Sequence, residues 1–258
     1  MPAEPLADTL IARLREHFRE GAWDEATRQR LQAEAEALHA GTPALRQSLR
    51  GMAAALREEP ERMREHHRAA LRAAPEAARP YGCYAASLAL LGFIEEAAAT
   101  AAQGAQLAPD DPEALLELLA RQHQAGRLGD AAATLERLEG LAPHAYPLRP
   151  WREPLTAARE ALQASALPEG ALQEAVQLTC TVLHEAGCHL SRLGVRAVAH
   201  EGGEWLYIGV ALLGRGPETA AALDERLAER IAEQGERYPA LLQGALIAGF
   251  EPGRPATP

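Results

Sequence analysis

The chain has 258 residues, of which 47% are hydrophobic and only 4% aromatic, so it can bury a sizeable core of closely packed helices. Its net charge of −10 disfavours non-specific binding to nucleic acids or anionic membranes. All 26 basic residues are arginine, and lysine and asparagine are absent, which is typical of a GC-rich bacterial genome. The three cysteines form no disulfide framework, and neither a signal pattern nor a membrane span is apparent. We therefore expect a cytoplasmic protein.

The middle of the chain repeats one spacing after 34 residues. Each of the units 78–111 and 112–145 predicts two amphipathic helices, which are separated by a turn at a glycine and closed by a proline that cannot continue a helix. The recurring glycine, alanine, leucine and proline are Gly92, Ala97, Leu107 and Pro109 in the first unit, and Gly126, Ala131, Leu141 and Pro143 in the second.

Two earlier segments fit the same spacing less closely. In 44–77, Glu58 takes the place of the turn glycine, whereas Pro75 keeps its position. In 7–40, Gly21 fits, but the closing proline is displaced. Terminal units of a repeat array are often atypical because they cap the stack, so we expect four helical hairpins in all.

The unit length, the glycine between the helices, the following alanine and the closing Leu-x-Pro resemble the tetratricopeptide repeat family. The resemblance covers about residues 7–145 and implies an α-solenoid of stacked helical hairpins with a concave groove. It also implies a non-enzymatic scaffold or adaptor that binds a protein or peptide partner in this groove. An ordinary antiparallel helical bundle is the alternative.

In this family the first helix of each unit lines the groove, mainly at its second, fifth, ninth and twelfth positions. The lining implied for this chain is small and rather apolar, with one arginine, Arg79, and one histidine, His123, which suits a helical or extended apolar segment. The family's clamp for C-terminal carboxylates uses lysine and asparagine, and the chain has neither. The groove residues that the resemblance implies are Met52, Arg79, Ala86, Ala89, Leu116, Ala120 and His123, with Leu45, Ser48, Ala55, Gly82 and Glu113 beside them.

The segment 151–166 is amphipathic, and we expect it to cap the last repeat with Trp151 and to end a helical domain at residue 166. Residues 167–258 change in pattern and predict a small α+β domain. Its elements in chain order are a helix over 169–191, strands over 195–199 and 204–213 joined by a turn at His200–Gly203, a helix over 218–234 and a strand over 245–250.

The hairpin at Gly202-Gly203, the helix after Pro217 and the closing Phe250-Glu251 resemble the ferredoxin-like C-terminal domain of cation diffusion facilitator transporters. The resemblance covers about residues 190–252 and implies a module that forms a homodimer or docks a second partner. The family's metal-binding histidines are missing here, because the helix has none. The resemblance therefore implies self-association without metal binding.

Cys180, His184 and Cys188 stand at spacing i, i+4, i+8 on the predicted helix, which could present soft ligands to zinc. In the competing interpretation the two cysteines are small core residues. A zinc site here would make the chain an accessory subunit or an enzyme. His66 and His67 lie in a charge-rich segment and are expected on a solvated helix face. We find no catalytic motif, and we expect no cofactor.

Overall fold

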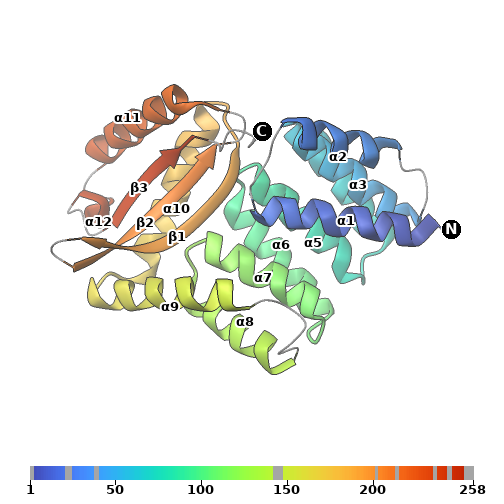
Figure 1. Cartoon of the computed structure of the whole chain (residues 1–258), viewed down its shortest axis with the longest axis horizontal. Helices are drawn as coiled ribbons and strands as arrows, with labels where there is room; N and C mark the ends of the chain where they lie inside the picture. The colour runs from blue at the N-terminus through green and yellow to red at the C-terminus, as the bar shows by residue number, and fades with distance from the viewer. Residues whose placement is uncertain are drawn as a thin grey trace.

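The computed structural model describes residues 3–20, 25–37, 41–141, 148–200, 203–212, 215–234, 237–242 and 246–252. Within these ranges the chain is mainly helical, with a small three-stranded sheet near its C-terminal end (Figure 1). None of the described helices combines the length and the apolar character that crossing a bilayer requires. The first helices are α1 (Ala3–Glu20), α2 (Glu25–Ala37), α3 (Pro43–Leu56), α4 (Pro60–Ala73), α5 (Ala78–Leu90), α6 (Ile94–Leu107), α7 (Pro112–Gln124), α8 (Leu128–Leu141) and α9 (Arg149–Ala164).

The hairpins α3–α4, α5–α6 and α7–α8 share one turn conformation. Their turn residues Glu58, Gly92 and Gly126 are 34 positions apart and all have positive φ, of 61°, 82° and 72°. After each of them, a backbone N–H returns to the carbonyl five residues earlier, as from Phe93 to Leu88 at 2.9 Å. The predicted spacing is thus confirmed at these turns, including the unit in which Glu58 replaces glycine.

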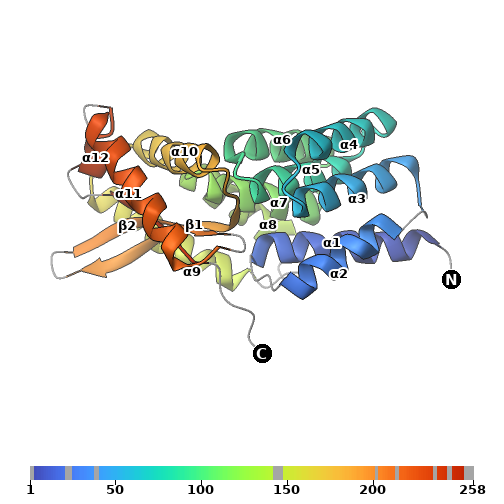
Figure 2. The ribbon, with the colours of Figure 1, turned by 90° about the horizontal axis from the view of Figure 1, so that it is seen from above.

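The first helices of these hairpins, α3, α5 and α7, pack side by side. Figure 2 shows α1 and α2 along one side of α3 and α5, and α4 and α6 along the other. Helix α1 departs from simple stacking, because it contacts α5 as well as its neighbour α3. It also reaches α7 through the side chain of Arg15. The segment predicted as the first repeat therefore forms two helices, but α1 lies across the array.

The C-terminal elements follow the predicted order of helix, strand, strand, helix and strand. The expected helix over 169–191 is too long, because Gly187, with φ of 62°, ends it after Glu185. The first strand consequently starts at Leu190, earlier than predicted. The observed elements are α10 (Glu169–Glu185), β1 (Leu190–His200), β2 (Gly203–Leu212), α11 (Pro217–Glu233), the short α12 (Pro239–Leu242) and β3 (Leu246–Glu251).

The sheet has the strand order β1-β2-β3. Strands β1 and β2 pair antiparallel from His200 opposite Gly203, which confirms the predicted hairpin, although its turn residues 201–202 lie outside the described ranges. Strands β2 and β3 pair parallel, and α11 makes the crossover between them. Helix α10 contacts α11 and β3 on one side and α6 on the other, while α9 contacts β1 and β2. One apolar core therefore runs through both predicted domains.

Candidate functional site

The predicted groove residues do come together, on the side of α3, α5 and α7 that faces α1 and β1. We call this surface the groove face. It is defined by Met52, Arg79, Ala86, Ala89, Leu116, Ala120 and His123. Five of them, Met52, Ala86, Ala89, Leu116 and Ala120, are at most 5% exposed. His123 is partly buried, and Arg79 is exposed. The structure thus corrects the expectation of an open groove, because α1 and β1 cover this face within the same chain.

An apolar stripe on α1 makes this contact. Ala7, Leu10, Ile11, Leu14 and Phe18 recur at the spacing of one helix face, and all are almost completely buried. They belong to the same core cluster as Met52 and Leu116. Burying a leucine or phenylalanine side chain contributes roughly 1.5–3 kcal/mol, so this stripe is a major part of the attachment of α1.

Arg15 adds a buried ionic attachment between α1 and α7. Its guanidinium donates to the carboxylate of Glu117 at 3.0 Å and to that of Glu113 at 3.1 Å. Glu117 also accepts from Arg121 at 2.7 Å. Burial is the largest single effect and lowers the pKa of Arg15, but the charges of Glu117, Cys83 and Glu113 and the hydrogen bond to Glu117 together outweigh it, so the pKa lies above its ordinary value. The guanidinium lies against α5 at Gly82, where an added Cβ would meet it at 3.4 Å.

A second ion pair joins α1 to the exposed edge of the groove face. Arg79 of α5 donates to Asp8 of α1 at 2.5 Å, and both side chains are partly exposed. Asp8 precedes Arg15 by seven positions, or about two helical turns, so both project from one side of α1. Helix α1 therefore presents Asp8 to the basic Arg79 on α5, and two turns later it presents Arg15 to the acidic residues on α7.

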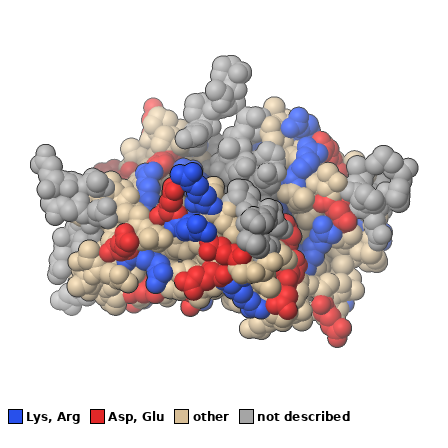
Figure 3. Space-filling view, turned by 60° about the horizontal axis from the view of Figure 1, so that its bottom comes forward, with Lys and Arg blue, Asp and Glu red and all other residues tan. Residues whose placement is uncertain are grey.

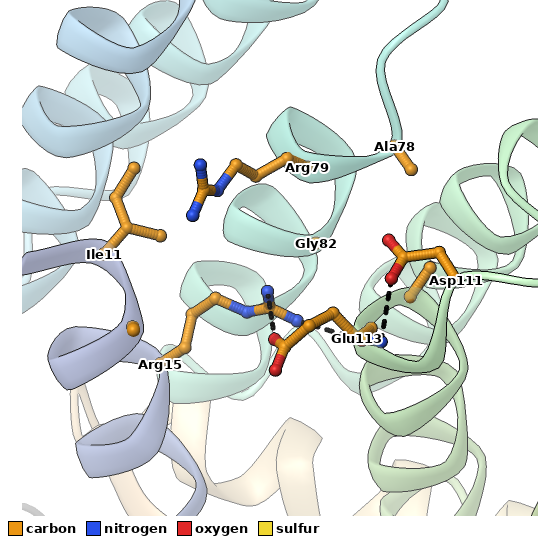
Figure 4. Close-up of a pocket in the computed structure, with 9 residues that line it drawn as sticks. Ile11, Arg15, Ala78, Arg79, Gly82, Asp111 and Glu113 are labelled. Atoms are coloured by element: carbon orange, nitrogen blue, oxygen red, sulfur yellow. Dashed lines mark hydrogen bonds and ion pairs between the residues drawn. The ribbon is translucent and has the colours of Figure 1, made fainter. Parts of the chain in front are cut away.

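A cavity of about 460 Å³ remains between α1 and the N-terminal ends of α5 and α7 (Figure 4). Figure 4 shows Arg15 and Arg79 projecting into the space between the helices, with Glu113 and Asp111 opposite. Asp111 accepts the backbone N–H of Glu113 at 3.1 Å and thereby caps α7. Both arginines are engaged in ion pairs. The lining residues are Ile11, Ala12, Arg15, Ala78, Arg79, Gly82, Asp111, Glu113 and Ala114.

The far end of the groove face is closed by β1 and α9. His123 of α7 packs edge-on against Trp151 of α9, with ring centroids 5.9 Å apart. Burial lowers the pKa of His123, and a contact with the backbone of Val195 in β1 opposes this shift. Trp151 is partly buried against the core. Trp151 of α9 thus lies beside α7 of the last hairpin.

The structure does not bring Cys180, His184 and Cys188 together as ligands of one metal ion. Among the described residues, which include Cys180, His184 and Cys188, no group of three potential ligands could hold a metal ion. Cys188 lies beyond the end of α10, so the three residues do not share a helix stripe. The Nε2 of His184 donates to the carbonyl oxygen of Leu91 at 2.7 Å, and both cysteines are buried.

His67 was expected on a solvated face, but it is completely buried. The hydroxyl of Ser87 donates to the carbonyl of Cys83, so the Nε2–H of His67 donates to the Ser87 oxygen at 2.9 Å. The ring also stacks on Tyr84, and burial lowers its pKa to about 3. Because neither His67 nor Ser87 has any exposure, this pair cannot reach a substrate and has a structural role.

Helix α10 and the short segment after it, up to His189, run along the turns of the helical hairpins. Leu172 packs at the Gly126 turn and His184 at the Gly92 turn, while His189 lies 3.8 Å from Glu58 at the third. Glu169 accepts the backbone N–H of Gly129 at 3.0 Å, at the start of α8. The inner side of the C-terminal region is therefore used to hold three hairpins together. No pattern in the sequence of α10 indicates these contacts with the hairpin turns.

Figure 3 shows arginines interspersed with acidic residues over one face, without a continuous field of one sign. Charged side chains on neighbouring elements form ion pairs, such as Arg127 with Glu95 at 2.5 Å and Arg152 with Glu139 at 2.6 Å. Comparison of the chain with protein-family models, with curated proteins and with solved structures found no match.

Proposed function

We propose that this protein is a non-enzymatic scaffold of the tetratricopeptide type that holds a segment of a partner protein on the groove face. The observation that carries the proposal is the seating of α1, an amphipathic helix, on this face through an apolar stripe and the ion pairs of Asp8 and Arg15. The mechanism would be burial of a partner's apolar side chains, with ion pairs at its edges to select the partner.

The repeated hairpins support this proposal. Three successive turns have the same backbone conformation and the same 34-residue spacing, which favours a solenoid over an irregular bundle. The small residues Ala86, Ala89 and Ala120 on the groove face allow another helix to approach α5 and α7 closely. Such a surface recognises shape and apolar area, and it needs no reactive side chain.

The C-terminal module provides a second contact in this proposal, either to another copy of the chain or to a second partner. Its sheet buries one face, and on the other face Val198 is 38% exposed, opposite Trp205 in the paired strand. Sedimentation of the full chain tests dimerisation. A dimer that dissociates in Val198→Arg supports a role for this face in self-association, whereas a monomer at every concentration removes the homodimer.

Site-specific photo-cross-linking in the native host tests the main proposal. A cross-linking amino acid at position 79 lies at the exposed edge of the groove face, and the matched control at position 149 is a highly exposed arginine on α9. A protein joined to position 79 but not to position 149 is the expected result. Identical products from both positions, or no product from position 79, would overturn the proposal.

A further inference from the structure

We infer that α1 is a built-in occupant of the partner site, and that the partner is an amphipathic helix with an acidic residue seven positions before an arginine. This inference rests on the proposed function and names the partner class and the form of regulation. A partner helix would take the place of α1 on the groove face. The chain would therefore be closed until such a helix competes with α1.

The apolar contact sets the first requirement for the incoming helix. The stripe Ala7, Leu10, Ile11, Leu14 and Phe18 fills the space over α3 and α5 with side chains of mixed size. A competitor must present apolar side chains at the same four- and three-residue steps. A helix without this stripe would leave Met52 and Leu116 facing water.

The ion pairs of Asp8 and Arg15 set the second requirement. Glu117 has a side-chain exposure of 1% and faces the charges of Arg15 and Arg121. A helix without a cation at the position of Arg15 would leave this carboxylate buried with fewer partners, which is costly in a low-dielectric interior. Arg79 likewise selects an acid at the position of Asp8. A helix laid in the opposite direction would place like charges together at both points, so the pairs also fix its direction.

The cavity beside α1 shows where a competitor can bind better than α1 does. Ala12 lines this space of about 460 Å³, and its methyl group leaves the volume between α5 and α7 largely unfilled. A larger side chain with an apolar stem at the same helix position would project into it. A partner that fills the cavity gains contact area that α1 lacks, which offsets the advantage that α1 has as a tethered segment.

Exchange between α1 and a partner follows a two-state equilibrium. The partner binds only molecules in which α1 has left the groove face. The apparent dissociation constant is therefore the intrinsic one divided by the fraction of open molecules. Substitutions that loosen α1 should raise this fraction and tighten partner binding. A residue that merely stabilises the fold would show no such effect, and this difference makes the inference testable.

The probe is a fluorescein-labelled peptide of residues 3–20 added to the full-length chain. We expect Leu14→Asp, which disrupts the stripe of the tethered α1, to bind the peptide about ten-fold or more tightly than the wild-type chain does. The matched control is Thr9→Asp, an equally acidic change at an exposed position of α1, and it should bind like the wild type. A peptide with Asp8→Arg and Arg15→Glu should bind Leu14→Asp about ten-fold more weakly.

Equal binding of the native and charge-reversed peptides to Leu14→Asp would overturn the inference, as would failure of folded Leu14→Asp to bind either peptide. If circular dichroism shows that this variant does not fold, hydrogen exchange of the wild-type chain decides. If the α1 amides exchange through a local opening that leaves α5 protected, α1 is a displaceable helix. If the amides of both helices exchange only on global unfolding, the inference is overturned. If the peptides bind with the expected charge dependence but no protein is cross-linked to position 79, the proposed function is contradicted, while α1 remains a displaceable helix.

Discussion

The guanidinium of Arg15 on α1 lies 3.0 Å from the carboxylate of Glu117 on α7, although 102 positions separate them in the chain. Both side chains are almost fully buried, and Glu117 also accepts from Arg121. One carboxylate thus faces two buried guanidinium groups. This cluster joins the N-terminal helix to the last complete hairpin.

We predict that Glu117→Gln lowers the free energy of unfolding by about 3 kcal/mol, because two buried guanidinium groups lose the negative charge they face. The control is Glu113→Gln, since Glu113 also pairs with Arg15 but its side chain is 49% exposed. That change should cost less than about 1 kcal/mol. Urea denaturation of the two variants measures both values, and a similar small loss in each would show that the buried cluster is not an important attachment.

Gly51 should not tolerate a side chain. A Cβ at this position of α3 would lie 2.5 Å from the ring of His67, which is held by Ser87 and Tyr84. We predict that Gly51→Ala destabilises the protein by about 2 kcal/mol or more, despite the better helix propensity of alanine. Gly140→Ala is the control, because nothing lies within 4 Å of its added Cβ on the exposed face of α8. Thermal unfolding should show a lower midpoint for the first variant and an unchanged or higher one for the second.

His67 should make the stability depend on pH. The pKa of His67 is about 3 in the folded chain and 6.5 as a free side chain. Below pH 6.5 His67 is therefore protonated in the unfolded chain but stays neutral in the folded chain. The contribution of His67 to stability is therefore fully present above pH 6.5 and falls by about 1.4 kcal/mol per pH unit between pH 6.5 and about 3. Urea denaturation at pH 7 and pH 5 should show a larger loss for the wild type than for His67→Gln. An equal loss in both would assign the acid sensitivity to other groups.

The local part of the fold could be predicted from the sequence, because it depends on residues close together in the chain. The 34-residue spacing correctly predicted the turns at Gly92 and Gly126 and identified Glu58 as their equivalent. The C-terminal order of elements followed from the change of period. The end of α10 was missed although Gly187 marks it, because the following Cys188 and His189 extended an apparent helical pattern.

The arrangement of the candidate site could not be predicted, because it depends on distant pairs. The stripe on α1 looks the same whether the helix stacks beside α3 or crosses to α5. Nothing near Arg15 or Glu117 in the sequence indicates that they meet. His67 was placed in solvent because its neighbours are charged, and only the space left by Gly51 on another helix admits its ring.

Positions 58 and 92 are equivalent in the repeat, so introducing glycine at the first and removing it from the second should change the melting temperature in opposite directions. Glu58 has φ of 61°, a conformation that strains a side chain by roughly 1 kcal/mol or more, so Glu58→Gly should raise the melting temperature by about 2–3 °C. Gly92→Ala should lower it, because its φ is 82° and the new Cβ would lie 2.9 Å from Nε2 of His184.

Loss of the Glu58 carboxylate near His189 should not cancel this gain. The two groups are 3.8 Å apart, and burial lowers the pKa of His189, so at pH 7.5 the imidazole is neutral and the ion pair contributes little. Scanning calorimetry at pH 7.5 checks both variants. A lower melting temperature for Glu58→Gly would mean that contacts of the Glu58 side chain outweigh its backbone strain, and that this turn is held differently from the two glycine turns.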